Sequence, residues 1–292
     1  MILKEKIKKE YPPFSVAICV YEKDNAEWFD LALGSIINQT VQPDEIILVV
    51  DGLIPKSIQF VIDKYTRICS EGIEGKKIQY HVIKSEKQQG LGRALNRAVE
   101  NAENELIARM DSDDISQKYR FEEQLKRFCQ EKDLAIVGGQ IAEFIDSEDN
   151  IIGRRIVPTE DGQLKEYMKR RCPFNHMTVM FKKSCIQKVG GYKDWFWNED
   201  YYLWIRMALA NLKFGNLSET LVKVRVGKDM YRRRGGIKYF KSEIEIQRLM
   251  HKNQIIGNGR FVINCFERFI IQLLLPNAVR SWVFKKFARR RG

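Results

Sequence analysis

Short apolar runs alternate with amphipathic stretches along the first half of the chain. The apolar runs are typical of buried strands, and the stretches between them carry apolar residues at helical spacing, as at Leu33, Ile36 and Ile37. This alternation predicts a doubly wound α/β fold with a mostly parallel sheet. The predicted strands cover residues 14–20, 45–50, 78–83, 105–110 and 134–137.

The second half of the chain is more mixed, and it ends in a helical pattern from about Lys238 onward. Residues 261–274 form a broad apolar face, which Pro276 interrupts. We therefore expect an α/β domain over residues 1–236 and a helical, basic segment over residues 237–292. The mixed region has predicted strands at residues 151–157, 177–181 and 221–226, and predicted helices at residues 164–169 and 201–210.

The fourth predicted strand ends in three carboxylates, those of Asp111, Asp113 and Asp114. The carboxyl end of a strand in an open α/β sheet is the edge at which ligands bind. A turn can aim two of these carboxylates at one hard cation, so the cluster predicts a Mg²⁺ or Mn²⁺ site that neutralises a diphosphate. Capping of the following helix by Asp114 or Ser116 is the alternative, and it accounts for one acidic residue rather than three.

The chain has a net charge of +12 and a pI of about 9.3, which favours a polyanionic partner. Much of the positive charge lies at residues 232–234 and in the C-terminal tail. In the tail, basic residues stand beside Trp282, Phe284 and Phe287, a pattern typical of helices on an anionic membrane surface. Packing of the tail helices on the α/β domain is the competing interpretation.

Six scattered cysteines show neither paired nor zinc-binding spacing. They indicate reduced thiols in a cytoplasmic protein. The stretch from Lys4 to Glu10 is mostly charged, so no secretory signal is expected there, and no apolar run approaches the length of a membrane span.

The order of seven motifs resembles the family 2 glycosyltransferases with a GT-A fold, specifically the bacterial enzymes that build capsule, exopolysaccharide or O-antigen. The resemblance implies an inverting, metal-dependent transfer of a sugar from a nucleotide-diphosphate sugar, with a UDP-sugar as the expected donor. It also implies an acceptor hydroxyl on a polyprenyl-diphosphate-linked saccharide, reached at the inner face of the plasma membrane. The motifs are residues 15–21, 35–40, 44–52, 90–96, 110–114, 173–176 and 198–201.

The resemblance assigns roles to residues in these motifs. Asp51 would help to hold the nucleotide base, while Gly90 and Arg93 would contact the donor at a helix N-terminus. Asp200 would take the proton from the acceptor hydroxyl, and Glu199 would orient the acceptor or the base. The bland alternatives are a plain Asp-Gly turn after the second strand and a pair of acidic residues at a helix start.

Further residues are candidates near the acceptor or the diphosphate. By resemblance, His176 lies in that vicinity. Trp195 and Trp197 can stack on sugar faces or belong to the core. Arg233 and Arg234, next to two glycines, can fold over a bound diphosphate or form a solvated basic loop.

Two other functions fit parts of the sequence. A sugar-nucleotide-forming nucleotidyltransferase also needs a parallel sheet and a metal-binding aspartate, but residues 21–25 do not form the expected glycine-rich basic loop. A basic nucleic-acid-binding protein is permitted by the charge, but the sequence shows no recognised binding motif. We therefore expect no nucleic-acid partner.

Overall fold

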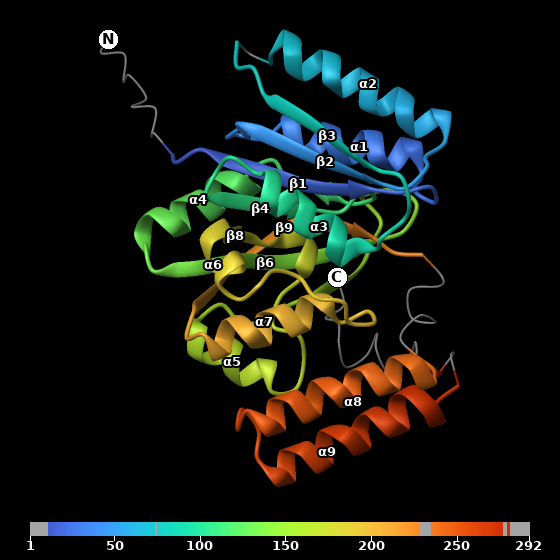
Figure 1. Ribbon diagram of the computed structural model, residues 1–292, viewed down its shortest axis with the longest axis vertical. Helices are drawn as coiled ribbons and strands as arrows, with labels where there is room; N and C mark the ends of the chain where they lie inside the picture. Colours follow the sequence, from blue (N-terminus) through green and yellow to red (C-terminus); the bar gives the residue numbers. More distant parts are fainter. Residues whose placement is uncertain (1–10, 74, 228–234, 277–278, 281–292) are drawn as a thin grey trace.

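The computed structural model describes residues 11–73, 75–227, 235–276 and 279–280 (Figure 1). Its strands form a nine-stranded sheet in the order β3-β2-β1-β4-β8-β6-β9-β5, with β7 paired to β6. Strands β3, β2, β1 and β4 are mutually parallel, as the alternating pattern predicts. The α/β fold class is therefore confirmed.

The first half of the chain follows the predicted elements closely. The observed ends of each strand differ from the predicted ends by at most two residues, because the apolar run and the flanking turn residues indicate the same bounds. The elements here are β1 (Phe14–Val20), α1 (Ala26–Ile37), β2 (Glu45–Asp51), α2 (Lys56–Glu71), β3 (Gln79–Ser85), α3 (Leu91–Asn101), β4 (Leu106–Met110), β5 (Ile115–Ser116) and α4 (Arg120–Gln130).

The second half adds antiparallel pairing to the sheet. Strand β8 runs antiparallel to both β4 and β6, whereas β9 runs parallel to β6. The predicted strand at residues 177–181 is shorter, because a 3₁₀ turn occupies its first part. The elements are β6 (Leu134–Phe144), β7 (Ile151–Arg155), α5 (Asp161–Met168), η1 (His176–Thr178), β8 (Met180–Lys182), α6 (Lys183–Lys188), α7 (Glu199–Leu209) and β9 (Lys213–Arg225).

Strand β6 is much longer than the predicted strand at residues 134–137. The prediction stops before Gly138 and Gly139, but β6 continues through them. Glycines usually weaken a strand pattern. Here they allow close approach: a Cβ on Gly139 would lie 2.5 Å from the Leu221 side chain, and one on Gly138 would lie 2.4 Å from Asn216 Oδ1. The two glycines therefore mark tight packing of β6 against β9 rather than the end of a strand.

Side chains alternate between the two faces of the sheet, so the strands supply two cores. Val16 and Ile18 of β1 pack on the face covered by α1, α2 and α4, whereas Ala17 packs on the face covered by α3, α5 and α7. This three-layer arrangement leaves the carboxyl ends of β1, β2 and β4 together at one edge of the sheet.

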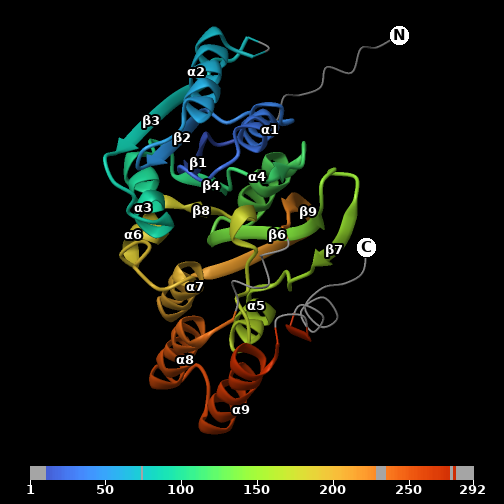
Figure 2. The same cartoon turned by 90° about the vertical axis from the view of Figure 1, so that its right-hand side faces the viewer.

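The chain continues into two antiparallel helices, α8 (Ile237–Lys252) and α9 (Asn258–Phe269), followed by the π-helical turn η3 (Ile270–Leu274). Figure 2 shows these helices side by side, below α5 and α7. Trp195, in the loop before α7, joins them to the domain because its Nε1 donates a hydrogen bond to the Ser242 carbonyl oxygen at 3.3 Å. Among the described residues, no helix combines the length and the apolar character needed to cross a membrane.

Helix α9 turns its polar face inward. Asn264 and Arg268 are buried, and Arg268 Nε donates to Glu243 Oε2 of α8 at 2.6 Å. Arg268 also donates to the Arg170 carbonyl oxygen, which anchors α9 to the segment after α5. The apolar side chains of this segment face outward, with exposed members at Val262, Ile263, Phe266, Phe269 and Leu274.

Candidate active site

The parallel strands bring acidic residues from three separate segments to one edge of the sheet. Asp51 is the last residue of β2, and Asp111 directly follows β4. Because β1 lies between these strands, the loop after it, which carries Asp24, reaches the same edge. Ser112 Oγ donates to Asp24 Oδ2 at 2.9 Å, so the two loops are hydrogen-bonded to each other.

The predicted metal-binding carboxylates lie together. One oxygen each of Asp111, Asp113 and Asp114 can be chosen so that all three lie within 4.8 Å of one another. The buried Arg109 guanidinium binds Asp111 in a bidentate manner, with Nη1 2.7 Å from Oδ2 and Nη2 on Oδ1. The Arg225 backbone N–H donates to Asp114 Oδ1 at 3.0 Å. These donors orient the carboxylates, and the all-oxygen set fits a hard divalent cation.

The pKa values of this cluster indicate an excess of negative charge that Arg109 only partly offsets. Burial, with the charges of Asp111 and Asp24, raises the pKa of Asp113 to about 7. Burial, opposed by hydrogen bonds from Tyr21 and Ser112, raises the pKa of Asp24 to about 6. The pKa of Asp114 is also raised, by burial and by the adjacent charges. A cation between these groups would relieve the repulsion between them.

Asp51 holds the loop that opens α3. Its Oδ1 accepts from the Gln89 N–H at 2.8 Å, and its Oδ2 accepts from the Gly90 N–H at 2.9 Å. Gly90 has φ of +93°, a conformation that favours glycine, and it directly precedes the first helical residue. Each carboxylate oxygen can accept one more hydrogen bond. The contact between Asp51 and a nucleotide base stays a prediction.

The N-termini of α3 and α7 face each other. A Cβ on Gly92 would lie 3.8 Å from the Glu199 Cβ, so little space separates the two helix starts. Arg93 Nη2 pairs with Asp194 Oδ2 at 2.6 Å, and both side chains are exposed. Exposed pairs of this kind contribute little stability, so Arg93 can exchange Asp194 for a phosphate.

Glu199 and Asp200 occupy the first turn of α7. Burial and the neighbouring Asp200 charge raise the pKa of Glu199 to about 7, and burial also raises the pKa of Asp200. Cys172 Sγ lies 3.5 Å from Asp200 Oδ2, and burial raises the pKa of this thiol well above its usual value, so it stays protonated and donates. Sequence reasoning did not identify Cys172, which is 28 positions away along the chain.

His176 belongs to a network that connects α3 to the loop before α7. Its Nε2 lies 2.9 Å from the Tyr192 hydroxyl oxygen, and burial together with Arg109 holds its pKa well below the usual value. Asn96 of α3 forms two reciprocal hydrogen bonds with the Tyr192 backbone, each 2.7 Å long. His176 is therefore neutral and fixed in position.

The two predicted tryptophans differ. Trp195 stacks on Tyr202 with ring centroids 4.3 Å apart and packs against α8, as the core alternative expects. Trp197 is 48% exposed, has φ of +60°, and lies beside the exposed Phe196 ring, with centroids 5.7 Å apart. Of the two, Trp197 is the ring that a saccharide can reach. Arg233 and Arg234 lie outside the described residues.

Sequence reasoning assigned no role to Arg109 or Arg225, and it considered Asp24 only as a cap of the first helix, a role that Asn25 fills. A signal existed for Arg109, because a charged residue inside an apolar strand needs a buried partner. Arg225 had no comparable signal, since its contacts with Asp113 and Asp114 join residues more than a hundred positions apart.

Comparison with known proteins places this edge of the sheet in context. Residues 15–187 match the model of glycosyl transferase family 2. The chain is 37% identical over 280 residues to the UDP-Gal:alpha-D-GlcNAc-diphosphoundecaprenol beta-1,3-galactosyltransferase of Escherichia coli, covering 96% of this chain and 98% of that protein. It is 31% identical over 277 residues to the amylovoran biosynthesis glycosyltransferase AmsE of Erwinia amylovora, covering 94% and 98%.

A solved structure shows the same fold. The mannosyltransferase PcManGT from Pyrobaculum calidifontis, in complex with GDP-Man and Mn2+, superposes with a TM-score of 0.61 at 14% identity. The match covers 96% of this chain and 76% of that chain, and it confirms the predicted GT-A fold.

The family match spans more than half of the chain, and two relatives above 30% identity are covered almost completely. These findings confirm the resemblance seen in the ordered motifs and favour a glycosyltransferase over a nucleotidyltransferase or a nucleic-acid-binding protein. The chain belongs to glycosyl transferase family 2, and it is a glycosyltransferase.

Proposed function

We propose that the protein is an inverting, metal-dependent enzyme that transfers a sugar from a UDP-sugar to a hydroxyl of a lipid-linked saccharide in cell-surface polysaccharide synthesis. The observation that carries this proposal is the convergence of two acidic groups at one edge of the sheet. Asp111, Asp113 and Asp114 form one group, and Glu199 and Asp200 form the other, close enough for the Asp111 charge to raise the Glu199 pKa.

Asp113, with Asp111 or Asp114, would hold Mg²⁺ or Mn²⁺. When bound, such an ion offsets the charge that develops on the leaving diphosphate. Arg109 keeps Asp111 in the orientation that this role needs, because its bidentate contact fixes both carboxylate oxygens. The helix starts at Gly90 and Glu199 add backbone N–H groups that favour a phosphate nearby.

Asp200 takes the proton from the acceptor hydroxyl, and Glu199 orients the acceptor. A base works best when its pKa is close to the operating pH, and burial shifts both carboxyl groups in that direction. The deprotonated hydroxyl attacks the anomeric carbon and the diphosphate leaves in the same step. A single displacement inverts the configuration, so no carboxylate nucleophile is required.

The proposed donor and acceptor follow from the relatives. The Escherichia coli relative is named for UDP-Gal as donor and for a diphosphoundecaprenol-linked GlcNAc as acceptor. Asp51 would contact the uracil base of such a donor, since it lies at the same edge of the sheet, at the end of β2. Trp197 suits the acceptor, since its exposed ring directly precedes α7.

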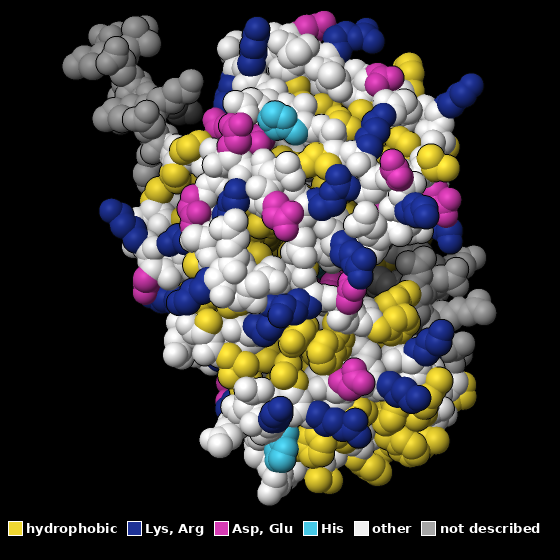
Figure 3. Space-filling model, viewed as in Figure 1, with side chains coloured by type: hydrophobic (Ala, Val, Ile, Leu, Met, Phe, Trp, Pro, Cys, Tyr) yellow, Lys and Arg dark blue, Asp and Glu magenta, His cyan; other side chains and the backbone are white. Residues whose placement is uncertain are grey.

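A lipid-linked acceptor requires access to a membrane surface, and α9 supplies a suitable face. Figure 3 shows hydrophobic side chains gathered over α8 and α9, with Lys and Arg side chains among them. The outward apolar residues include Val262, Phe266 and Phe269, which are 63%, 61% and 41% exposed. We infer that residues 237–292 attach the catalytic domain, residues 1–236, to the cytoplasmic face of an anionic membrane.

A panel of nucleotide sugars tests the proposal. The protein is incubated with each sugar and Mn²⁺, Mg²⁺ or EDTA, and slow donor hydrolysis and thermal stabilisation are measured. We expect one UDP-sugar to stabilise the protein and to be hydrolysed only with a divalent ion. Equal hydrolysis in EDTA would contradict metal dependence, and a preference for another nucleotide would contradict the UDP donor.

A further inference from the structure

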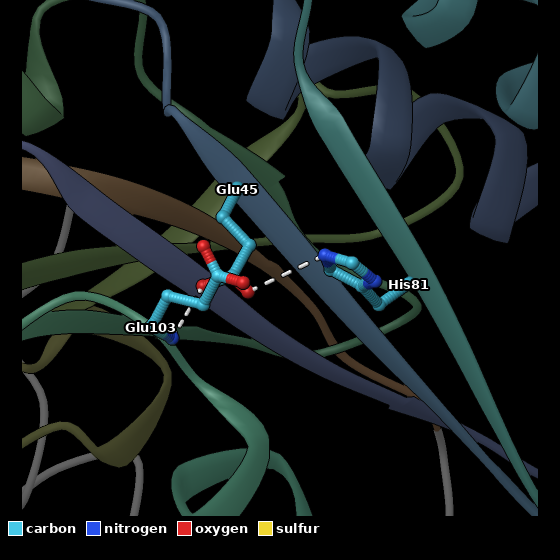
Figure 4. A group of neighbouring side chains, drawn as sticks. All are labelled: Glu45, His81 and Glu103. Atoms are coloured by element: carbon cyan, nitrogen blue, oxygen red, sulfur yellow. Dashed lines mark hydrogen bonds and ion pairs between the residues drawn. The ribbon is translucent and has the colours of Figure 1, made fainter.

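A second cluster of metal-ligating side chains lies at the opposite edge of the sheet, near the amino ends of the strands. Glu45 is the first residue of β2, His81 lies in β3, and Glu103 lies between α3 and β4 (Figure 4). A ligand atom from each of the three side chains can be chosen so that all lie within 4.8 Å of one another. Asp51 ends β2 and Asp111 follows β4, at the carboxyl ends of the parallel strands, so the two clusters lie at opposite edges of the sheet.

Glu45 is the buried member of this cluster, with 1% of its surface exposed. Its Oε2 accepts hydrogen bonds from Ser15 Oγ and from the Glu103 N–H. Its Oε1 is buried and has no hydrogen-bond partner in the part of the chain that the structure describes. It faces His81 Nε2 at 3.6 Å, which is too long for a hydrogen bond. A buried carboxylate oxygen without a donor is unfavourable, so this geometry calls for a positive group between the two atoms.

We propose that Glu45, His81 and Glu103 form a second cation site, selective for a first-row transition ion such as Zn²⁺. Zinc binds nitrogen and oxygen at about 2.0–2.2 Å, which places two ligand atoms about 3.3–3.5 Å apart across a tetrahedral ion. The 3.6 Å between Glu45 Oε1 and His81 Nε2 is close to this separation. Glu103 supplies the third ligand, and water completes the coordination because His81 and Glu103 are exposed.

The donor sets distinguish the two sites. The cluster at Asp111 offers only carboxylate oxygens, which suit Mg²⁺ or Mn²⁺, whereas His81 supplies an imidazole nitrogen, which suits zinc. A bound ion here would connect β2, β3 and the segment after α3. The site is therefore structural: its occupancy stabilises the fold without taking part in sugar transfer.

Zinc titration of the full chain tests the proposal. The Asp113→Asn variant serves as the starting protein, because it weakens binding at the other cluster. We expect a hundredfold excess of Zn²⁺ over its dissociation constant to raise the melting temperature by about 5 °C. Adding His81→Ala should abolish this rise, and equilibrium dialysis should show one fewer bound zinc ion per chain.

His251→Ala, made in the same Asp113→Asn protein, is the matched control. His251 lies on α8 and contacts Asn258 rather than a carboxylate. This variant should keep both the thermal rise and the zinc stoichiometry. The proposal is overturned if the starting protein binds no zinc, or if His81→Ala binds as much zinc as the His251→Ala control. The first result would mean that His81 and Glu45 form only an ion pair.

Discussion

The catalytic edge of the sheet gathers buried acidic groups, whereas the outer face of α9 exposes apolar side chains. At the catalytic edge, the carboxyl groups of four aspartates lie close together, the buried Arg109 guanidinium binds only one of them, and the pKa values of Asp113 and Asp24 are raised. On α9, Arg268 and Asn264 bind α8 and the segment after α5, and apolar rings face outward. The first region has an excess of negative charge, and the second exposes apolar side chains that the described part of the chain does not cover.

This contrast separates two roles that a sequence pattern easily merges. Buried polar residues in α9 form hydrogen bonds and an ion pair that stabilise the fold, whereas the buried carboxylates at the catalytic edge repel one another. Changes at the catalytic edge should therefore alter activity and can even increase stability. Changes on the outer face of α9 should alter attachment and leave stability nearly unchanged.

The largest expected effect follows from Asp113→Asn. Loss of this carboxylate removes a proposed ligand of the divalent ion, and such an ion contributes several kcal/mol to catalysis, so turnover should fall about a thousandfold. Steady-state rates with saturating donor and Mn²⁺ measure this. Activity equal to that of the parent would show that the cluster is not the metal site.

Asp200→Asn should reduce transfer by about a hundredfold, because general base catalysis contributes at least that much. Binding of the UDP-sugar should be unchanged, since Asp200 faces Cys172 rather than the acidic cluster. Rapid-quench measurement of transfer, beside calorimetric donor binding, separates these effects. Glu199→Gln is the companion variant, and a larger loss there would exchange the two proposed roles.

The double variant Phe266→Ser and Phe269→Ser should weaken binding to anionic vesicles by at least tenfold, because burial of each ring in lipid is worth about 1.5–3 kcal/mol. Its melting temperature should fall by only a few degrees, since Phe266 is 61% exposed and Phe269 makes only an edge contact with the Phe240 ring. Phe60→Ser on α2 is a matched control, because that ring is 72% exposed and lies far from α9 in the sequence. Vesicle sedimentation that is unchanged in the double variant would refute attachment through α9.

The smallest expected effect is on the stability of the metal-free protein. The pKa of Asp113 is raised from 3.8 to about 7, so its contribution to stability is fully present below pH 3.8 and is lost as the pH rises to about 7. Asp113→Asn should therefore stabilise the metal-free protein at pH 8 by about 1 kcal/mol, and less at pH 5. Chemical unfolding in EDTA at both values tests this, and a destabilised variant at pH 8 would contradict the assigned repulsion.

Much of the fold could be predicted because local signals agree. The strand at residues 14–20 is β1 with the same bounds, since its apolar run is flanked by turn residues. Only parts of the long strands β6 and β9 were predicted, at residues 134–137 and 221–226. The rest of β6 was missed because Gly138 and Gly139 weaken the pattern, and their role depends on a distant neighbour, Leu221.

The acidic cluster was likewise visible in the sequence, because Asp111, Asp113 and Asp114 are adjacent along the chain. Contacts between distant segments were not, as with Cys172 and Asp200. The orientation of α9 was also hidden. An amphipathic pattern shows that two faces exist, but only the partner Glu243 on α8 decides that the polar face turns inward.

The reciprocal hydrogen bonds between Asn96 and Tyr192 have a mechanical consequence. They fasten the helix behind the donor loop to the backbone that leads toward Asp200, and Arg206 secures the same backbone through the Gly191 carbonyl oxygen. These bonds join α3 to the loop before α7 and to α7 itself. A shift of α3 on binding of the nucleotide sugar would move the loop before α7, where Asp200 and the acceptor are proposed to lie. In Asn96→Ala, the affinity for the acceptor should therefore no longer depend on whether the donor is bound.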